Sequence, residues 1–202
     1  MKPSSFAALA DNPHGTLSMS PSIDLPANAL VALTRESLVA LRGALFRDVG
    51  VGAVAPLQEA GYAGGQGMYD AFGRWLGSRG LASPDMLSAA EFSVRATEFF
   101  REAGWGGIEV GALDGVATID SKDWAESDPA YPLDFPGCYY SSGMLADFFG
   151  RLAGEPLAAM EVECRSMGGS RCRFLVGSGD MLQHIYDEMA RGLSYDQVAA
   201  AS

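Results

Sequence analysis

Two of the three cysteines in this chain of 202 residues lie on either side of a glycine pair, in the stretch Glu161–Cys172, EVECRSMGGSRC. The segments PLAAMEVECRS and SRCRFLV around MGGS predict a β-hairpin, because glycines permit the backbone angles that a tight turn needs. With the turn centred on Gly168, Cys164 lies directly opposite Cys172. Opposed Cβ atoms are about 4.5–5.5 Å apart, so both thiolates can reach one zinc ion through Zn–S bonds of about 2.3 Å.

A tetrahedral zinc site needs two ligands beyond this cysteine pair. The remaining cysteine, Cys138, lies outside the hairpin, and Glu161 or Glu163 can supply a carboxylate oxygen. In an ideal strand both glutamates face away from Cys164, so a β-bulge or a strand end is needed to turn one of them inward. The spacing alone leaves three interpretations open: a zinc site, ordinary buried cysteines, or a redox pair.

The charge balance argues against direct binding to nucleic acids. The chain has 25 acidic against 14 basic residues, a formal net charge of −11, and no cluster of Lys and Arg. Affinity for phosphates comes mainly from such basic groups, so DNA or RNA would be repelled. No apolar run approaches the roughly 18–20 residues that span a bilayer, and an odd number of cysteines fits a reducing compartment. We therefore expect a cytoplasmic protein that does not cross a membrane.

The chain divides into three parts. Residues 1–24 carry prolines at positions 3, 13 and 21 and no sustained periodicity, which predicts an extended arm. An arm of this kind is seldom ordered unless it lies on a partner, so we expect residues 1–24 to contact another protein, such as a large complex. Residues 25–180 form the expected main domain, and residues 181–202 are expected to form a C-terminal helix and tail.

The pattern of elements predicts an α+β fold. Helical periodicity dominates up to Gly104 and includes a helix that starts at a capping box formed by Ser88 and Glu91. Alternating segments on either side of Asp114-Gly115 then predict a hairpin with a type I′ turn. A helix over residues 139–153 separates this hairpin from the cysteine hairpin. Helices interleaved with hairpins, without regular βαβ alternation, are typical of an antiparallel sheet packed with helices.

Glycines are concentrated in one predicted helix, in the sequence GYAGGQG at residues 61–67. Each glycine inside a helix costs about 0.5–1 kcal/mol relative to alanine, so a cluster of glycines needs a structural reason. The stretch matches neither GxGxxG after a strand nor a GK[ST] ending, which argues against a phosphate-binding loop. We expect these glycines to allow another backbone to pack closely.

The cysteine hairpin belongs to a longer pattern in the second half of the chain. The pattern comprises Cys138, Gly143, Phe148, Gly150, the GEP connection, Glu161-Val-Glu-Cys164, Gly168 and Cys172-Arg-Phe. It resembles the 4-vinyl reductase domain family, which includes proteins linked to bacteriochlorophyll biosynthesis and the sensory domains of phenol- and xylene-responsive bacterial activators. The resemblance is densest over residues 104–177. It implies a fold similar to the small subunits of the TRAPP trafficking complex.

The resemblance implies a zinc site and a neighbouring apolar pocket. In the aromatic-sensing members, zinc is bound by three cysteines and one glutamate. The matching residues here are Cys138, Glu161, Cys164 and Cys172. Four protein ligands make such a zinc site structural, because catalysis needs an open coordination position. The pocket would involve large rings, which suit either an aromatic ligand or the core: Trp105, Trp124, Tyr139, Tyr140 and Phe148.

These features favour a non-enzymatic, zinc-stapled domain that binds an apolar or aromatic small molecule, such as a tetrapyrrole precursor, and acts through protein partners. Phenol itself is disfavoured, because His14 and His184 do not match the histidine that orients phenol in the sensors. A second interpretation is an accessory or assembly subunit of a larger complex, photosynthetic by the family's associations, that docks through its arm and helices. A third is a vinyl reductase of bacteriochlorophyll biosynthesis, although the chain has no dinucleotide fingerprint. No catalytic residues are expected, and the resemblance implies a homodimer through the early helices.

Overall fold

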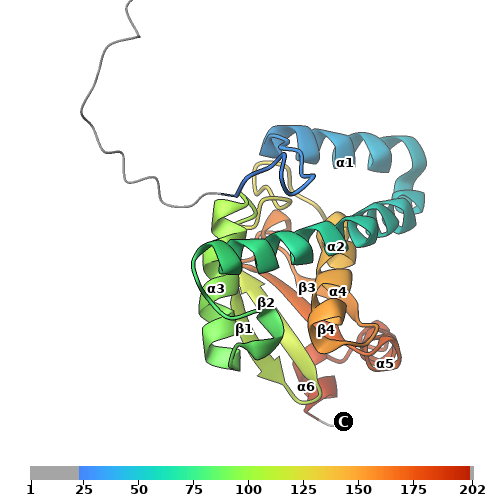
Figure 1. Ribbon diagram of the computed structural model, residues 1–202. Coiled ribbons are helices and arrows are strands. Elements are labelled where there is room, and N and C mark those ends of the chain that lie inside the picture. The colour runs from blue at the N-terminus through green and yellow to red at the C-terminus, as the bar shows by residue number, and fades with distance from the viewer. Residues whose placement is uncertain (1–22, 201–202) are drawn as a thin grey trace, which may run out of the picture.

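The computed structural model describes residues 23–200, which form a four-stranded antiparallel sheet with helices on both faces (Figure 1). The strands are β1 (Glu109–Leu113), β2 (Val116–Ser121), β3 (Ala158–Glu163) and β4 (Cys172–Gly177). Their order across the sheet is β1-β2-β4-β3, so the two predicted hairpins lie side by side through the pairing of β2 with β4. The predicted α+β fold is therefore confirmed. Residues 1–22 of the predicted arm lie outside the described residues.

Six α-helices and three short 3-10 helices surround this sheet in the described part of the chain. The α-helices are α1 (Arg35–Val49), α2 (Val54–Ser78), α3 (Ala89–Glu102), α4 (Tyr139–Ala153), α5 (Gly179–Ala190) and α6 (Tyr195–Ala199). The 3-10 helices are η1 (Gly50–Ala53), η2 (Pro84–Met86) and η3 (Arg165–Met167). As expected, no helix within residues 23–200 is both long and apolar enough to cross a membrane.

Strand β4 contributes side chains to two separate cores, because successive residues of a strand point to opposite faces. Phe174 and Val176 pack into the larger core, which α2, α3 and α4 supply on one face of the sheet. Leu175 packs with Leu182 and Ile185 of α5 on the other face. Complete burial of such side chains stabilises a fold by about 1.5–3 kcal/mol each. The central strand is thereby held between two layers of helices.

Helices α2 and α4 lie in close contact because glycines leave no side chains between them. A Cβ atom on Gly61 would collide with the carbonyl oxygen of Tyr140, and one on Gly65 would collide with the side chain of Asp147. From the other helix, a Cβ on Gly143 would collide with the backbone of α2. The predicted close packing of the GYAGGQG stretch is therefore confirmed. This packing fixes the N-terminal end of α4, which directly follows Cys138.

Two of the predicted local signals are confirmed, and one is wrong in detail. Ser88 and Glu91 form the capping box at the start of α3. The β1–β2 hairpin turns at Asp114-Gly115, as predicted. A type I′ turn requires positive φ at both central residues, but only Gly115, with φ of 80°, has it. The predicted turn type is therefore wrong, because an Asp-Gly pair also fits turns in which only the glycine is left-handed.

Candidate metal centre

A β-bulge in β3 brings Glu161 and Cys164 to the same face of the sheet. The pairing of β3 with β4 advances residue by residue from Ala158 to Glu161, and then shifts so that Glu163 pairs with Arg173. The extra residue, Val162, reverses the alternation beyond it, as a bulge does. Glu161 and Cys164 are both buried. The bulge is therefore the feature that the sequence required for a glutamate to join the cysteine pair.

The loop before α4 supplies the third cysteine. Cys138 lies at the N-terminal boundary of α4, and its backbone N–H donates to Glu161 Oε2 over 2.8 Å. Residues of this loop are also held by Ser166 in η3: the N–H of Leu133 donates to its carbonyl oxygen over 2.8 Å, and the N–H of Asp128 to its hydroxyl over 3.0 Å. The loop thus delivers Cys138 to the bulged end of β3.

Cys138, Glu161, Cys164 and Cys172 form one buried cluster, which is here called the Cys3Glu cluster. One ligand atom from each residue lies within 4.8 Å of the others, and the Sγ atoms of Cys138 and Cys164 are 3.9 Å apart. Tetrahedral coordination with Zn–S bonds of about 2.3 Å places sulfurs about 3.8 Å apart. All three cysteines are free rather than joined in a disulfide. The cluster therefore has the composition and spacing of a metal site.

The hydrogen bonding of Glu161 fits a carboxylate that binds a cation. Its Oε1 atom is buried and has no hydrogen-bond partner, whereas buried polar atoms are nearly always paired. Burial, followed by the nearby charge of Cys164, raises the pKa of Glu161 to about 8. Burial likewise raises the pKa of the Cys138 thiol. Several acidic groups are thus confined to one desolvated place, and a divalent ion would relieve both the orphaned oxygen and the charge.

The thiols also interact with one another. Hydrogen bonds from Cys138 and then from Cys172 lower the pKa of Cys164. Soft thiolate ligands favour zinc over magnesium or calcium, which prefer oxygen. A set of three sulfurs and one oxygen would complete a tetrahedral zinc site without an open position.

Glu126 supports the centre from the loop before α4, although sequence reasoning did not identify it. Its buried carboxylate accepts hydrogen bonds from the N–H groups of Tyr140 and Ser141, at 3.2 and 2.8 Å, and from the Ser141 hydroxyl. It therefore caps α4, for which Cys138 supplies no side-chain cap. Burial raises the pKa of Glu126 to about 7. No local pattern signals this role, because the carboxylate lies 15 residues before Ser141.

The five rings that the resemblance assigned to a pocket pack against one another and into the core. Trp105 stacks on Trp124, with ring centroids 5.6 Å apart, and on Tyr140, with centroids 5.9 Å apart. Trp124 and Phe148 are fully buried in the larger core. Tyr139 instead faces α1, where its ring lies 5.8 Å from that of Phe46. Three of the rings thus form a stack beside the N-terminal end of α4, and the other two lie elsewhere.

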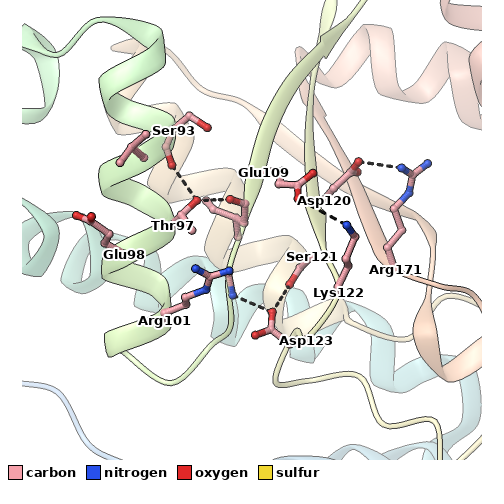
Figure 2. A pocket seen from close by; sticks show the side chains of 13 residues that line it. Ser93, Thr97, Glu98, Arg101, Glu109, Asp120, Ser121, Lys122, Asp123 and Arg171 are labelled. Atoms are coloured by element: carbon pink, nitrogen blue, oxygen red, sulfur yellow. Dashed lines mark hydrogen bonds and ion pairs between the residues drawn. The ribbon is translucent and has the colours of Figure 1, made fainter.

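The structure has a cleft of about 660 Å³ between α3 and the adjacent ends of β1 and β2 (Figure 2). Its charges are largely paired: Arg171 contacts Asp120 at 3.1 Å, and Lys122 lies 3.8 Å from Glu109. The Asp123 carboxylate accepts a hydrogen bond from a backbone N–H group. None of the five predicted pocket rings lines this cleft. Its polar walls do not suit the apolar ligand expected from the sequence.

A second hollow, of about 290 Å³, lies between α2, α4 and β3. Its lining combines Tyr62 of α2 with small residues of α4 and β3, including Gly143 and Ala159. None of the five predicted pocket rings lines this hollow either.

Comparisons with known proteins place the Cys3Glu cluster within a recognised domain. Residues 129–178 match the family model of the 4-vinyl reductase domain. No curated protein matches the chain significantly. Among solved structures, the phenol-responsive sensory domain of the transcription activator PoxR, determined with phenol, is 19% identical. That match covers 73% of this chain and 75% of the sensory domain, with a TM-score of 0.57.

Two further solved structures are similar to this chain. Subunit 3 of the trafficking protein particle complex from Naegleria fowleri, covalently bound to palmitic acid, is 15% identical; the match covers 71% of this chain and 91% of the subunit, with a TM-score of 0.50. A vinyl-4-reductase family protein from Methanocaldococcus jannaschii is 20% identical over 78% of this chain and 83% of its own, with a TM-score of 0.44. At these identities a structural match shows the fold alone. The resemblance expected from the sequence is confirmed: residues 129–178, which contain the whole Cys3Glu cluster, match the domain that defines the 4-vinyl reductase family.

Proposed function

We propose that this protein is a zinc-stapled binding domain, in which the Cys3Glu cluster holds one structural zinc ion and the surrounding domain binds an apolar or aromatic small molecule. The observation that carries the metal assignment is the buried cluster with an orphaned carboxylate oxygen. Zinc would supply no reaction here, because four protein ligands leave no position for a substrate. Its contribution is to tie the segment before α4 to the bulged end of β3 and the start of β4.

The ligand class is argued from the Trp124–Trp105–Tyr140 stack. Flat aromatic molecules bind by stacking on such rings, and Trp105 and Tyr140 are only half-buried. The phenol-bound sensory domain has a similar fold, which supports a ligand of this class without identifying it. A ligand at this place would displace Trp105 from between its two neighbours, since the rings fill the space in the structure.

The test combines metal analysis with ligand binding on the purified chain. Native mass spectrometry is expected to show one zinc ion per chain, and the zinc should be retained until a strong chelator is added. Indole, as a neutral aromatic probe, is expected to change the heat capacity or the near-ultraviolet circular dichroism of the wild type and to affect Trp105→Ala less. A chain without zinc would refute the metal assignment. Zinc with no response to indole or to larger aromatic probes would refute the binding role.

A second candidate function, an accessory subunit of a larger complex, is favoured by the apolar surface around α1. Val31 and Val51 are 85% and 84% exposed, and Leu33 and Leu41 are exposed with them. Exposed apolar groups that gather on one segment are typical of interaction sites. This candidate shares the zinc site but requires no ligand. Replacement of Val31 and Val51 by Ser should weaken assembly with the partner complex and leave zinc content unchanged.

A further inference from the structure

Helix α1 contains one buried charged residue on an otherwise exposed surface. Arg42 is only 3% exposed, whereas the side chain of Arg47 on the same helix is 71% exposed. Burial of a guanidinium is costly unless its donors are satisfied. Arg42 Nη1 donates to the carbonyl oxygen of Glu126 over 2.7 Å and makes a longer contact of 3.5 Å with that of Gly137. Arg42 therefore joins the two ends of the loop over residues 126–137.

The other contacts of α1 reach the same stretch of chain. The ring of Phe46 lies 5.3 Å from that of Phe135 and 5.8 Å from that of Tyr139. Arg35 donates to the carbonyl oxygen of Asp123 over 3.3 Å. Figure 1 shows α1 apart from the sheet, on the other side of α2. The loop before α4 is thus the surface on which α1 docks.

This loop is also attached to the Cys3Glu cluster at several points. Gly137, which Arg42 contacts, directly precedes the ligand Cys138. Glu126, which Arg42 also contacts, caps α4 with its carboxylate. On its other side, the loop is held by Ser166 in η3, between the ligands Cys164 and Cys172. The docking surface of α1 is therefore built from the segments that a metal ion would hold together.

We propose that Arg42 is a positioning residue that couples the docking of α1 to the metal site: a bound metal holds the 126–137 loop in the arrangement that Arg42 clamps, and its loss releases α1. The inference rests on the proposed zinc binding. Coupling between two sites is reciprocal, so removing the clamp must also weaken the metal site. The coupling would let a buried site change the surface that α1 offers to a partner.

The first test measures metal affinity in matched variants of the full chain. Co²⁺ and Zn²⁺ are titrated against a competing chelator into wild type, Arg42→Met and Arg47→Met. We expect Arg42→Met to bind both metals about tenfold more weakly, as for other groups that orient metal ligands, and Arg47→Met to match the wild type. The Co²⁺ absorption spectrum should keep its shape in all three proteins, because the ligands are unchanged. Arg42→Lys, which retains a charged donor, should recover part of the affinity.

The second test uses the wild type and does not depend on the folding of a variant. Amide hydrogen exchange is compared with and without Zn²⁺. We expect exchange in α1 (Arg35–Val49) to slow when zinc is bound, and we expect this effect to be smaller in Arg42→Met than in Arg47→Met. Wild type that binds no metal would refute the proposed function itself. Wild type that binds zinc, but with unchanged exchange in α1 and equal affinities in the two arginine variants, would refute the coupling alone.

Discussion

Glu161→Gln separates a metal ligand from an ordinary buried carboxylate, because the two roles predict different effects with and without zinc. The amide has nearly the same shape and retains an oxygen that can accept from the N–H of Cys138, as Glu161 Oε2 does over 2.8 Å. It lacks the charge that attracts a divalent ion. A change in groups that merely orient ligands costs about 10–100-fold in metal affinity. For a ligand itself we expect at least about 100-fold weaker zinc binding, which is about 2.7 kcal/mol.

The metal-free protein should respond in the opposite way or not at all. Wild-type Glu161 has a buried oxygen without a hydrogen-bond partner, and such a group costs about 1–3 kcal/mol. The amide exchanges this oxygen for a neutral group that also lacks a full set of partners, so we expect a change in unfolding free energy between zero and about 2 kcal/mol of stabilisation.

The assay is urea unfolding of wild type and Glu161→Gln, each with and without zinc. Glu163→Gln is the matched control, because Glu163 lies beyond the bulge and pairs with Arg171 at 2.8 Å. It should lower stability by up to about 1 kcal/mol, equally in both conditions. If Glu161→Gln destabilises the protein by the same amount with and without zinc, Glu161 is a packing residue and our reasoning is wrong.

Three further predictions follow from the same geometry. Cys172→Ala should abolish zinc retention and lower the unfolding free energy by several kcal/mol, since metal binding contributes directly to folding; unchanged melting with added zinc would count against the site. Gly61→Ala should destabilise by about 1–3 kcal/mol through overpacking against α4, whereas Gly73→Ala, which meets nothing within 4 Å, should be neutral or stabilising in thermal melts. Burial raises the pKa of Glu126 from 4.5 to about 7, so the folded state binds its proton more tightly and stability is lost as pH rises through this range. Relative to Glu126→Gln, the wild type should therefore lose up to about 3 kcal/mol as the pH rises between these two pKa values, and a constant difference in urea unfolding would contradict this.

The sequence was informative where the chemistry is local. Cys164 and Cys172 face each other because a short turn separates them, and the capping box of α3 depends on residues three positions apart. The addition of Glu161 needed the bulge in β3, which the alternation of the strand required but did not locate. Cys138 was assigned by resemblance alone, because nothing within the hairpin specifies which distant residue the loop delivers.

Contacts made by tertiary packing were not predictable from local patterns. Arg42 lies on an exposed helix, where arginine is ordinarily solvated, and its burial follows from the placement of the loop over residues 126–137. Glu126 shows the same limitation, since a carboxylate in a loop gives no sign that it will cap a helix that follows later in the chain. The roles of Trp124 and Phe148 were ambiguous for a different reason, because large rings satisfy the requirements of a core and of a ligand pocket equally.

The central claim is that the Cys3Glu cluster binds zinc, and metal stoichiometry with thiol reactivity tests it most directly. Chain purified under reducing conditions should contain one zinc ion, and its three thiols should react with a thiol reagent only after a chelator removes the metal or denaturant unfolds the chain. Zinc release and thiol exposure should then occur together. Chain without bound metal, which takes up none from added Zn²⁺, would contradict the account.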